Sequence, residues 1–332
     1  MTTLYIREPG VGIRRSGQRL IVYKGDGVLQ TVRLRDVERL VLFGSVEVSA
    51  PVWAALLEGG IETVLLSFGG KFRGRLAPAD GKNIFLRRTQ FQRYEDREYR
   101  LRVGKEIVTG KVRNARAVLQ QYARNHPSEA LAGAIVKLEA ARERAARQAS
   151  LDALLGAEGE AASLYFGALG TMIRAEFAFT TRNRRPPRDP VNALLSFGYT
   201  LLTTELTGAL AAQGLDPHVG LLHDLDYGRP SLALDVLEEF RQPVVDRLAV
   251  SLINRGVLTL AHFDDRGEAG VFLNDAGRPR FLEFYHRAMD AEFQEDRLPD
   301  QRTSYRGLFR RQARRMRLAL ENAADYAPYV AR

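Results

Sequence analysis

The sequence of 332 residues contains no cysteine, which excludes disulfide bonds, thiolate metal ligands and cysteine nucleophiles. It also has no uninterrupted apolar run long enough to cross a bilayer, and its first ten residues lack the apolar segment of a signal peptide. We therefore expect a cytoplasmic protein with no membrane partner. The remaining composition, 45% hydrophobic and 27% charged, is typical of a globular chain with room for two domains.

The net charge of +9 is distributed unevenly along the chain. Residues 81–150 hold 16 basic and 7 acidic residues, residues 301–332 hold 8 and 2, and residues 151–300 hold 14 and 23. Arginine supplies 43 of the 49 basic residues, and its guanidinium suits bidentate contacts with phosphate. A GC-rich genome would also enrich arginine. The segregation of charge, however, favours a carboxylate-containing site within a surface that binds a polyanion.

Two regions of different periodicity divide the chain. Residues 1–80 contain short strand-like runs separated by turns, with one short helix at 51–58. Residues 78–83 form a polar break, after which the pattern is helical. We predict an α+β protein with a small N-terminal β-rich domain at 1–80, used for dimerisation or docking, and a larger all-α C-terminal domain at 84–332. The strands are predicted at residues 4–6, 19–24, 27–34, 39–43, 62–67 and 72–76.

The predicted helical region begins with residues 85–123, where eight arginines are interleaved with aromatic residues. This combination is common on nucleic-acid-binding surfaces, although a solvated helix whose tyrosines face the core explains it equally well. Residues 180–191 form a stiff loop with four arginines and three prolines. We expect a helix that starts at residue 230 and continues to residue 254. The other helices are predicted at 128–149, 154–173, 192–212, 281–293 and 305–320, with short β or irregular structure at 256–280.

Residues 221–241 concentrate side chains that can bind a metal. His223 precedes a Gly-Arg-Pro turn and a predicted helix that carries Asp235, Glu238 and Glu239. Positions i and i+3 share a helix face, so Asp235 and Glu238 should point the same way, with Glu239 close beside them. An imidazole and paired carboxylates suit a divalent metal used in phosphate chemistry. A solvated acidic face beside a core histidine would give the same pattern.

A further carboxylate, Glu158, lies in the predicted helix at 154–173 and shares a face with Tyr165. Glu160 lies about 200° further around the helix, so the two glutamates cannot share one site. Small residues around Glu158 would let another helix or a substrate backbone come close. Alternatively, both glutamates are helix-start residues favoured by the macrodipole. Tyr165 either orients a phosphate or water, or is a packed aromatic residue with a satisfied hydroxyl.

Four motifs occur in a fixed order: LGAEG at 155–159, RPPRDPVNA at 185–193, LH at 222–223, and GRPSLALD at 228–235 followed by EEFR at 238–241. Together they resemble CRISPR-associated protein one, the integrase/endonuclease of CRISPR adaptation. The resemblance covers essentially the whole chain. Each motif is moderately specific, whereas the ordered set is strongly so.

The resemblance implies an N-terminal β-domain joined to an α-helical domain that carries the metal site. It also implies a homodimer that binds DNA and a dimer of a small partner, CRISPR-associated protein two. Carried over by position, the metal ligands are Glu158, His223 and Glu238, for Mg²⁺ or Mn²⁺, and Asp235 supports the catalytic site. Many family members have aspartate at the last ligand position, so Glu238 departs from the pattern by one methylene.

The implied function is insertion of short DNA spacers into the CRISPR array, by attack of a 3′-hydroxyl on a phosphodiester. A divalent metal can polarise the phosphoryl oxygen and help to activate the nucleophile, so no protein nucleophile is required. One alternative is a metal-dependent nuclease that hydrolyses branched or single-stranded DNA without integration. Another is a nucleic-acid-binding module without enzymatic activity.

Overall fold

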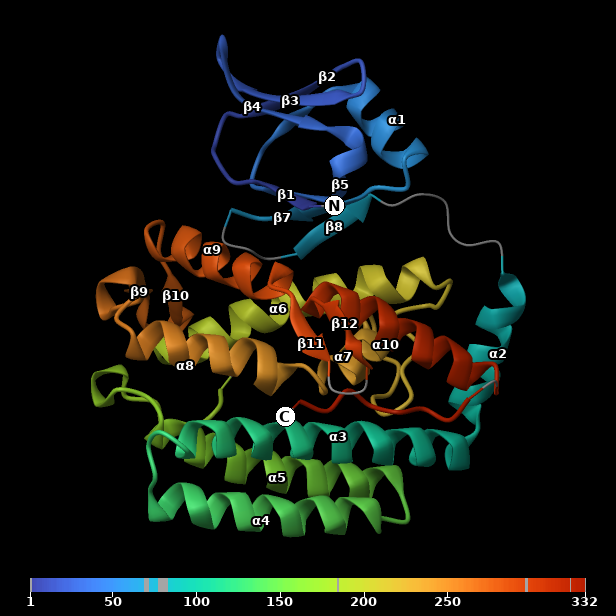
Figure 1. The fold of residues 1–332 in the computed structure, drawn as a ribbon, viewed down its shortest axis with the longest axis vertical. Helices are drawn as coiled ribbons and strands as arrows, with labels where there is room; N and C mark the ends of the chain where they lie inside the picture. The colour runs from blue at the N-terminus through green and yellow to red at the C-terminus, as the bar shows by residue number, and fades with distance from the viewer. Residues whose placement is uncertain are drawn as a thin grey trace. The chain divides into compact units, whose positions relative to one another are not determined.

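The computed structural model describes residues 2–68, 72–76, 83–183, 185–295, 298–322 and 324–331 (Figure 1). The chain divides into two compact units, Met1–Lys82 and Asn83–Arg332, which we call the β unit and the helical unit. The strand-rich region therefore precedes a mostly helical one, which confirms the predicted fold class. Of the predicted break at 78–83, only Asn83 belongs to the described residues.

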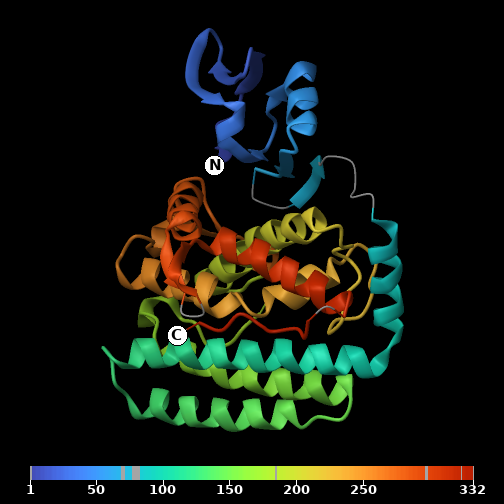
Figure 2. The ribbon, with the colours of Figure 1, turned by 45° about the vertical axis from the view of Figure 1, so that its right-hand side comes forward.

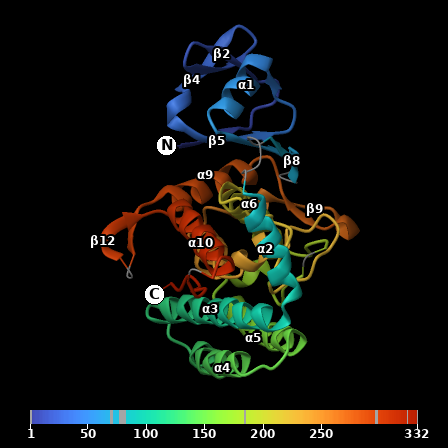
Figure 3. The same cartoon turned by 90° about the vertical axis from the view of Figure 1, so that its right-hand side faces the viewer.

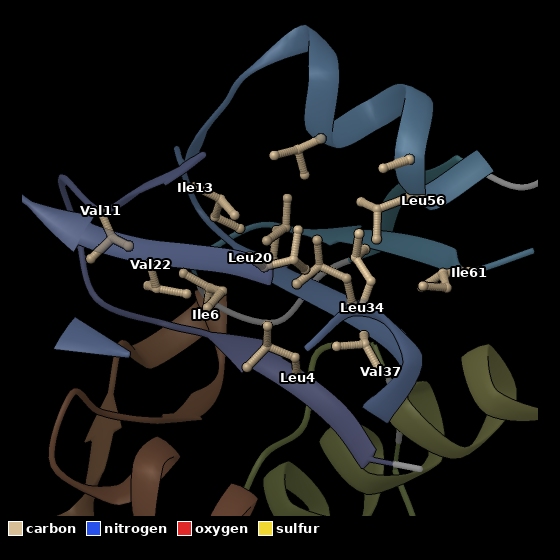
Figure 4. Packing of buried hydrophobic residues seen from close by; sticks show 14 residues of the cluster. Leu4, Ile6, Val11, Ile13, Leu20, Val22, Leu34, Val37, Leu56 and Ile61 are labelled. Atoms are coloured by element: carbon tan, nitrogen blue, oxygen red, sulfur yellow. The ribbon is translucent and has the colours of Figure 1, made fainter. Parts of the chain in front are cut away.

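The β unit contains two four-stranded sheets and one helix, α1 (Ala50–Glu58). In the first sheet β1, β5 and β7 are parallel and β8 is antiparallel to β7. Buried aliphatic side chains from both sheets and α1 meet in one core, in which Leu20 and Leu56 are wholly buried (Figure 4). The sheets have the orders β1 (Thr2–Ile6), β5 (Val37–Phe43), β7 (Glu62–Leu66), β8 (Phe72–Leu76) and β4 (Gly27–Arg33), β3 (Arg19–Lys24), β2 (Gly12–Ser16), β6 (Glu47–Val48).

The helical unit begins with two helices where the sequence predicted one. Asp96 ends α2 (Ile84–Glu95) and caps α3 (Arg97–Ala123), because its carboxylate accepts a hydrogen bond from Tyr99 N at 3.0 Å. α4 (Glu129–Ala146) and α5 (Leu151–Thr171) follow, each capped by a serine. α3, α4 and α5 run alongside one another, and each packs against the other two (Figures 1 and 2). Lys111 on α3 and Glu158 on α5 thereby come from neighbouring helices.

A second group of helices covers α3 on the side away from α4, as Figure 3 shows. α10 packs against both α6 and α9. Among the described residues this unit also contains two small antiparallel hairpins, so the predicted all-α domain includes some short strands. None of the described helices is long and apolar enough to cross a membrane. The elements are α6 (Pro190–Ala212), α7 (Ser231–Leu237), α8 (Arg247–Asn254), β9 (Phe263–Asp265), β10 (Val271–Leu273), α9 (Gly277–Asp290), β11 (Phe293–Glu295), β12 (Leu298–Thr303) and α10 (Tyr305–Leu320).

The predicted continuous helix from residue 230 to residue 254 is wrong. α7 ends at Leu237, and a π-helix at Arg241–Asp246 precedes α8. Pro243 lies inside this segment and has no N–H to donate, so it interrupts the regular hydrogen-bond ladder. Short π-helical segments are frequent at functional sites. Glu238 and Arg241, on either side of the start of this segment, form an ion pair at 2.8 Å, whereas the carboxylate of Glu239 has other partners.

Candidate functional site

The two predicted carboxylates, Glu158 and Glu238, meet at one side chain. Lys111 Nζ forms ion pairs with Glu158 Oε1 and, at 2.5 Å, with Glu238 Oε2. Lys111 and Glu238 are buried, whereas the side chain of Glu158 is 22% exposed. Carboxylates that are 80 positions apart in the sequence therefore share one cation at the edge of the protein interior.

His223 is oriented by Asp235, which is completely buried. Asp235 Oδ1 lies 2.7 Å from His223 Nδ1, and its two oxygens also accept the backbone N–H groups of Leu221, Leu222 and His223. A carboxylate can only accept, so Nδ1 carries the proton and the Nε2 lone pair remains free for a ligand. Asp235 thus orients the ring of His223 and fixes its tautomer, as carboxylates that are hydrogen-bonded to metal-binding histidines commonly do.

Neighbouring side chains stabilise the ionised form of Glu238. Burial alone would raise the pKa of Glu238, but Arg241, Lys111 and His223 together lower it to about 2. Arg241 Nη2 lies 2.8 Å from Glu238 Oε1, on the opposite side of the carboxylate from Lys111. Glu238 is therefore ionised at neutral pH, and His223 is near enough to influence it.

Glu239 does not lie beside Asp235 and Glu238 as predicted. Its carboxylate accepts the hydroxyl of Tyr326 and, at 2.7 Å, the backbone N–H of Tyr329. The turn after α7 rotates Glu239 away from Glu238, toward this C-terminal segment. Asp235, Glu238 and Glu239 are all at most 3% exposed, so a solvated acidic face is also excluded.

The C-terminal segment, residues 326–331, is hydrogen-bonded both to α3 and to the turn that carries Glu238. Asn114, one helical turn after Lys111, donates to Glu239 O at 2.6 Å and to Tyr329 O at 2.9 Å. Its Oδ1 accepts Ala331 N at 2.7 Å. A Cβ atom at Gly110 would lie 2.6 Å from Pro328, so glycine permits the close approach. This arrangement fixes the backbones on both sides of the Lys111–Glu238 ion pair.

We expect Asn114→Ala to lower the free energy of unfolding by about 3 kcal/mol, because the side chain satisfies two buried backbone carbonyls and one partly buried N–H. Urea unfolding followed by far-ultraviolet circular dichroism measures this change. Asn125→Ala, at an exposed position, should change it by less than about 0.5 kcal/mol. Fluorescence of the only tryptophan, Trp53 in α1, reports separately on the β unit and should keep its midpoint. Unchanged unfolding of Asn114→Ala would show that the segment does not hold α3.

Tyr165 is only 1% exposed and packs against Phe166, with ring centroids 5.3 Å apart. Burial and the nearby Asp246 raise the pKa of its hydroxyl well above the usual range. Tyr199 donates its hydroxyl to Asp246 Oδ1 at 2.5 Å, and the guanidinium of Arg241 lies 4.9 Å from the Tyr199 ring. The structure thus favours a packed Tyr165 over one that orients a phosphate. It also shows how Tyr199 supports Arg241.

Burial raises the pKa of Asp246 to about 6, although Tyr199, Tyr165, Arg182 and Arg241 each act to lower it. Asp246 closes the π-helix that begins at Arg241. The π-helical segment thus places a second buried carboxylate behind the ion pair of Arg241 with Glu238.

The site contains the kinds of side chain that bind a divalent cation, although the ammonium of Lys111 lies between the two carboxylates. Within the described ranges, no group of three or more histidine, aspartate and glutamate side chains is arranged to hold a metal ion. Nevertheless, two carboxylates already share one cation, and His223 offers a free Nε2. Carboxylate oxygens with one imidazole are a suitable set for Mg²⁺ or Mn²⁺. Glu158, Glu238 and His223 would hold such an ion once Lys111 moved.

The sequence did not single out Lys111, Arg241 or Asn114. A signal for Lys111 is nevertheless present, because it lies at helical spacing with the apolar residues Ile107, Val108 and Ala115. A lysine within an apolar stripe must find a buried partner. Its partners, Glu158 and Glu238, lie far away in the sequence and cannot be identified from α3 alone.

An arginine-lined cavity of about 490 Å³ lies between α3, α4 and the C-terminal segment. Glu139 is its one acidic side chain, and it pairs with Arg116 at 3.2 Å and with Arg142 at 2.6 Å. The hydrogen bond from Arg142 and the charges of Arg142, Arg116 and Arg113 lower the pKa of Glu139, although burial acts to raise it. The cavity therefore keeps an excess of positive charge. It is lined by Arg113, Arg116, Ala117, Gln120, Arg124, Glu139, Arg142, Val330 and Ala331.

Comparison with known proteins identifies close sequence relatives. A family model described as CRISPR associated protein Cas1 matches residues 4–287. A relative named CRISPR-associated endonuclease Cas1 2, from Rhodospirillum rubrum, is 42% identical over 294 residues, covering 85% of this chain and 84% of the relative. CRISPR-associated endonuclease Cas1 3 of Thermus thermophilus is 36% identical over 334 residues, covering 99% and 97%.

Solved structures share the fold over nearly the whole chain. A Cas1 protein from Thermotoga maritima has a TM-score of 0.81 at 25% identity and covers 99% of this chain and 100% of its own. A casposase bound to integration product has a TM-score of 0.82 at 23% identity, covering 99% and 93%. A Cas6-RT-Cas1–Cas2 complex contains a chain with a TM-score of 0.80 at 24% identity, covering 99% of this chain and 36% of that one.

Proposed function

This chain belongs to the Cas1 family of CRISPR-associated proteins, and from that membership we propose that it is a DNA endonuclease and integrase of CRISPR adaptation that depends on a divalent metal. The observation that carries the proposal is the convergence of Glu158 and Glu238 on one cation, beside His223. Three motifs from separate parts of the chain supply these residues. A solvated acidic face would not bring them together.

The residues of the site have distinct proposed roles. Glu158, Glu238 and the Nε2 atom of His223 hold Mg²⁺ or Mn²⁺, which supplies charge stabilisation for attack on a phosphodiester. Asp235 keeps the proton on Nδ1 and so preserves the free Nε2 lone pair. Arg241 holds one oxygen of Glu238 at 2.8 Å and leaves the other facing the cation position.

DNA is the proposed substrate, and its backbone is bound by the basic regions of the helical unit. The arginine-lined cavity offers guanidinium groups for phosphate contacts, which position DNA without reading its sequence. We further propose a homodimer that assembles with Cas2 and inserts short DNA segments into the CRISPR array. The fold match to a chain of a complex that contains Cas2 supports the second partner.

The proposed site could catalyse either of two reactions, strand transfer or hydrolysis. The fold match to a casposase bound to integration product favours strand transfer. Hydrolysis is favoured by the relatives from Rhodospirillum rubrum and Thermus thermophilus, which are named endonucleases. Both reactions need an activated oxygen nucleophile in line with the scissile phosphate, and they differ in whether DNA or water supplies it.

The purified protein should join an incoming DNA strand to a branched or repeat-containing target when Mn²⁺ or Mg²⁺ is present. We expect a 2′,3′-dideoxy end on the incoming strand to abolish joined product, because the 3′-hydroxyl is the nucleophile. Denaturing gels with labelled strands measure the product, and a chelator provides the metal-free control. Joining that persists with the blocked end, or a covalent protein–DNA adduct, would refute the strand-transfer mechanism. Cleavage without any joining would instead support the hydrolytic nuclease.

A further inference from the structure

Lys111 holds the position that the proposed metal requires. Its ammonium contacts both Glu158 and Glu238, and its side chain is 7% exposed. Around this point the two carboxylates are balanced by two cations, Lys111 and Arg241. The charges thus cancel in the metal-free protein. A buried pair of glutamates without Lys111 would repel each other and would each be costly to keep ionised.

We propose that Lys111 is an internal cation that holds this site together before the metal binds, is displaced when the metal enters, and then contacts the phosphate of bound DNA. The inference rests on the proposed function. It makes Lys111 both a competitor for the metal position and a catalytic residue in the loaded enzyme. No ion pair of merely structural purpose would have both properties.

Charge balance favours the departure of one cation when the metal binds, and the restraint on Arg241 makes Lys111 the cation that moves. A divalent cation between Glu158 and Glu238 would leave two positive charges in excess, and a phosphodiester group supplies negative charge at the same place. Arg241 is restrained, because its guanidinium pairs with Glu238 and lies over the ring of Tyr199. Lysine has a flexible four-carbon stem with a rotatable ammonium, so it can turn without moving its backbone.

Hydrogen bonds hold the backbone around Lys111, whereas its ammonium is held by two ion pairs. Asn114 ties α3 to Glu239 and to Tyr329 by hydrogen bonds of 2.6 and 2.9 Å. Lys111 Nζ contacts only the two carboxylates among the ion pairs of the described residues. An ammonium that leaves these carboxylates therefore stays within a side-chain length of the metal, which is where the substrate phosphate must lie.

Lys111→Met tests the proposal because Mn²⁺ affinity should rise whereas the reaction rate should fall. Without the competing ammonium, we expect Mn²⁺ to bind at least about tenfold more tightly in a calorimetric titration. The rate of DNA joining or cleavage at saturating Mn²⁺ should nevertheless fall about a hundredfold, because a cation at the phosphate is lost. The melting temperature should fall without metal and recover when Mn²⁺ is added. Lys111→Arg should retain the weaker Mn²⁺ affinity of the natural protein.

Lys24→Met, at an exposed position of β3 in the β unit, is the matched control and should leave both properties unchanged. If Lys111→Met does not fold, Lys111→Gln keeps the prediction testable, because it is neutral and can still donate to a carboxylate. Unchanged or weaker Mn²⁺ binding by the neutral variant, while the natural protein binds Mn²⁺, would overturn the inference and leave the metal site standing. Tighter binding with natural turnover would overturn the phosphate contact. Absence of Mn²⁺ binding by the natural protein would overturn the proposed metal function itself.

Discussion

Glu158→Gln is expected to reduce metal-dependent DNA cleavage and joining by at least about a thousandfold, because a metal contributes several kcal/mol of charge stabilisation to the transition state. The substitution keeps the size of the side chain but removes one of the two charges that share the cation. Folding should be little affected, since this side chain is the more exposed of the two glutamates. Single-turnover assays at saturating Mn²⁺ measure the loss.

Glu160→Gln supplies a matched control on the same helix. Glu160 lies two residues further along α5 and pairs with Arg144 at 2.6 Å on an exposed surface. We expect its substitution to leave activity within about twofold of the natural protein, as for most surface changes. DNA binding without metal should be equal in both variants. If Glu158→Gln cleaved or joined DNA at the natural rate, the carboxylate would not be a ligand of the catalytic metal.

Asp235→Asn is expected to lower the free energy of unfolding by about 3 kcal/mol and activity by about 10- to 100-fold. The carboxylate accepts three backbone N–H groups and faces His223 Nδ1, so four donors converge on its two oxygens. An amide has one oxygen and one NH₂ group. Two donors must therefore face another donor, or the proton of His223 must move to Nε2 and remove the free lone pair.

The control for this change is Asp226→Asn, in the loop between His223 and α7. Asp226 is exposed, and its carboxylate accepts the N–H of Tyr227 at 2.8 Å. Its substitution should alter stability by less than about 0.5 kcal/mol. Chemical denaturation and a Mn²⁺ titration measure both effects. Natural Mn²⁺ affinity in a folded Asp235→Asn variant would mean that Asp235 does not control the ring of His223.

The sequence predicted those elements whose burial follows a regular period. The helix predicted at 305–320 is α10, Tyr305–Leu320, because a buried apolar stripe alternates with arginines along its whole length. In contrast, β2 was missed, since three of its five residues are exposed and two of these are arginines. Its partners β3 and β6 determine its conformation through contacts that the local sequence does not encode.

The site shows the same division between local and distant determinants. Helical spacing predicted that Asp235 and Glu238 point the same way with Glu239 beside them, but it could not foresee the π-helix at Arg241–Asp246 or the hydrogen bond that Glu239 accepts from Tyr326. Lys111 was missed because its two partners lie in other motifs. The family resemblance is confirmed by the match over residues 4–287. The metal and the individual site roles stay predictions.

Anomalous diffraction from crystals grown with Mn²⁺ tests the central claim most directly. We predict one strong anomalous peak within about 2.5 Å of carboxylate oxygens of Glu158 and Glu238 and of His223 Nε2. The ammonium of Lys111 should no longer lie between the two carboxylates. A Mn²⁺ ion bound at another place, or an unchanged Lys111 bridge with no ion at a saturating concentration, would contradict the account.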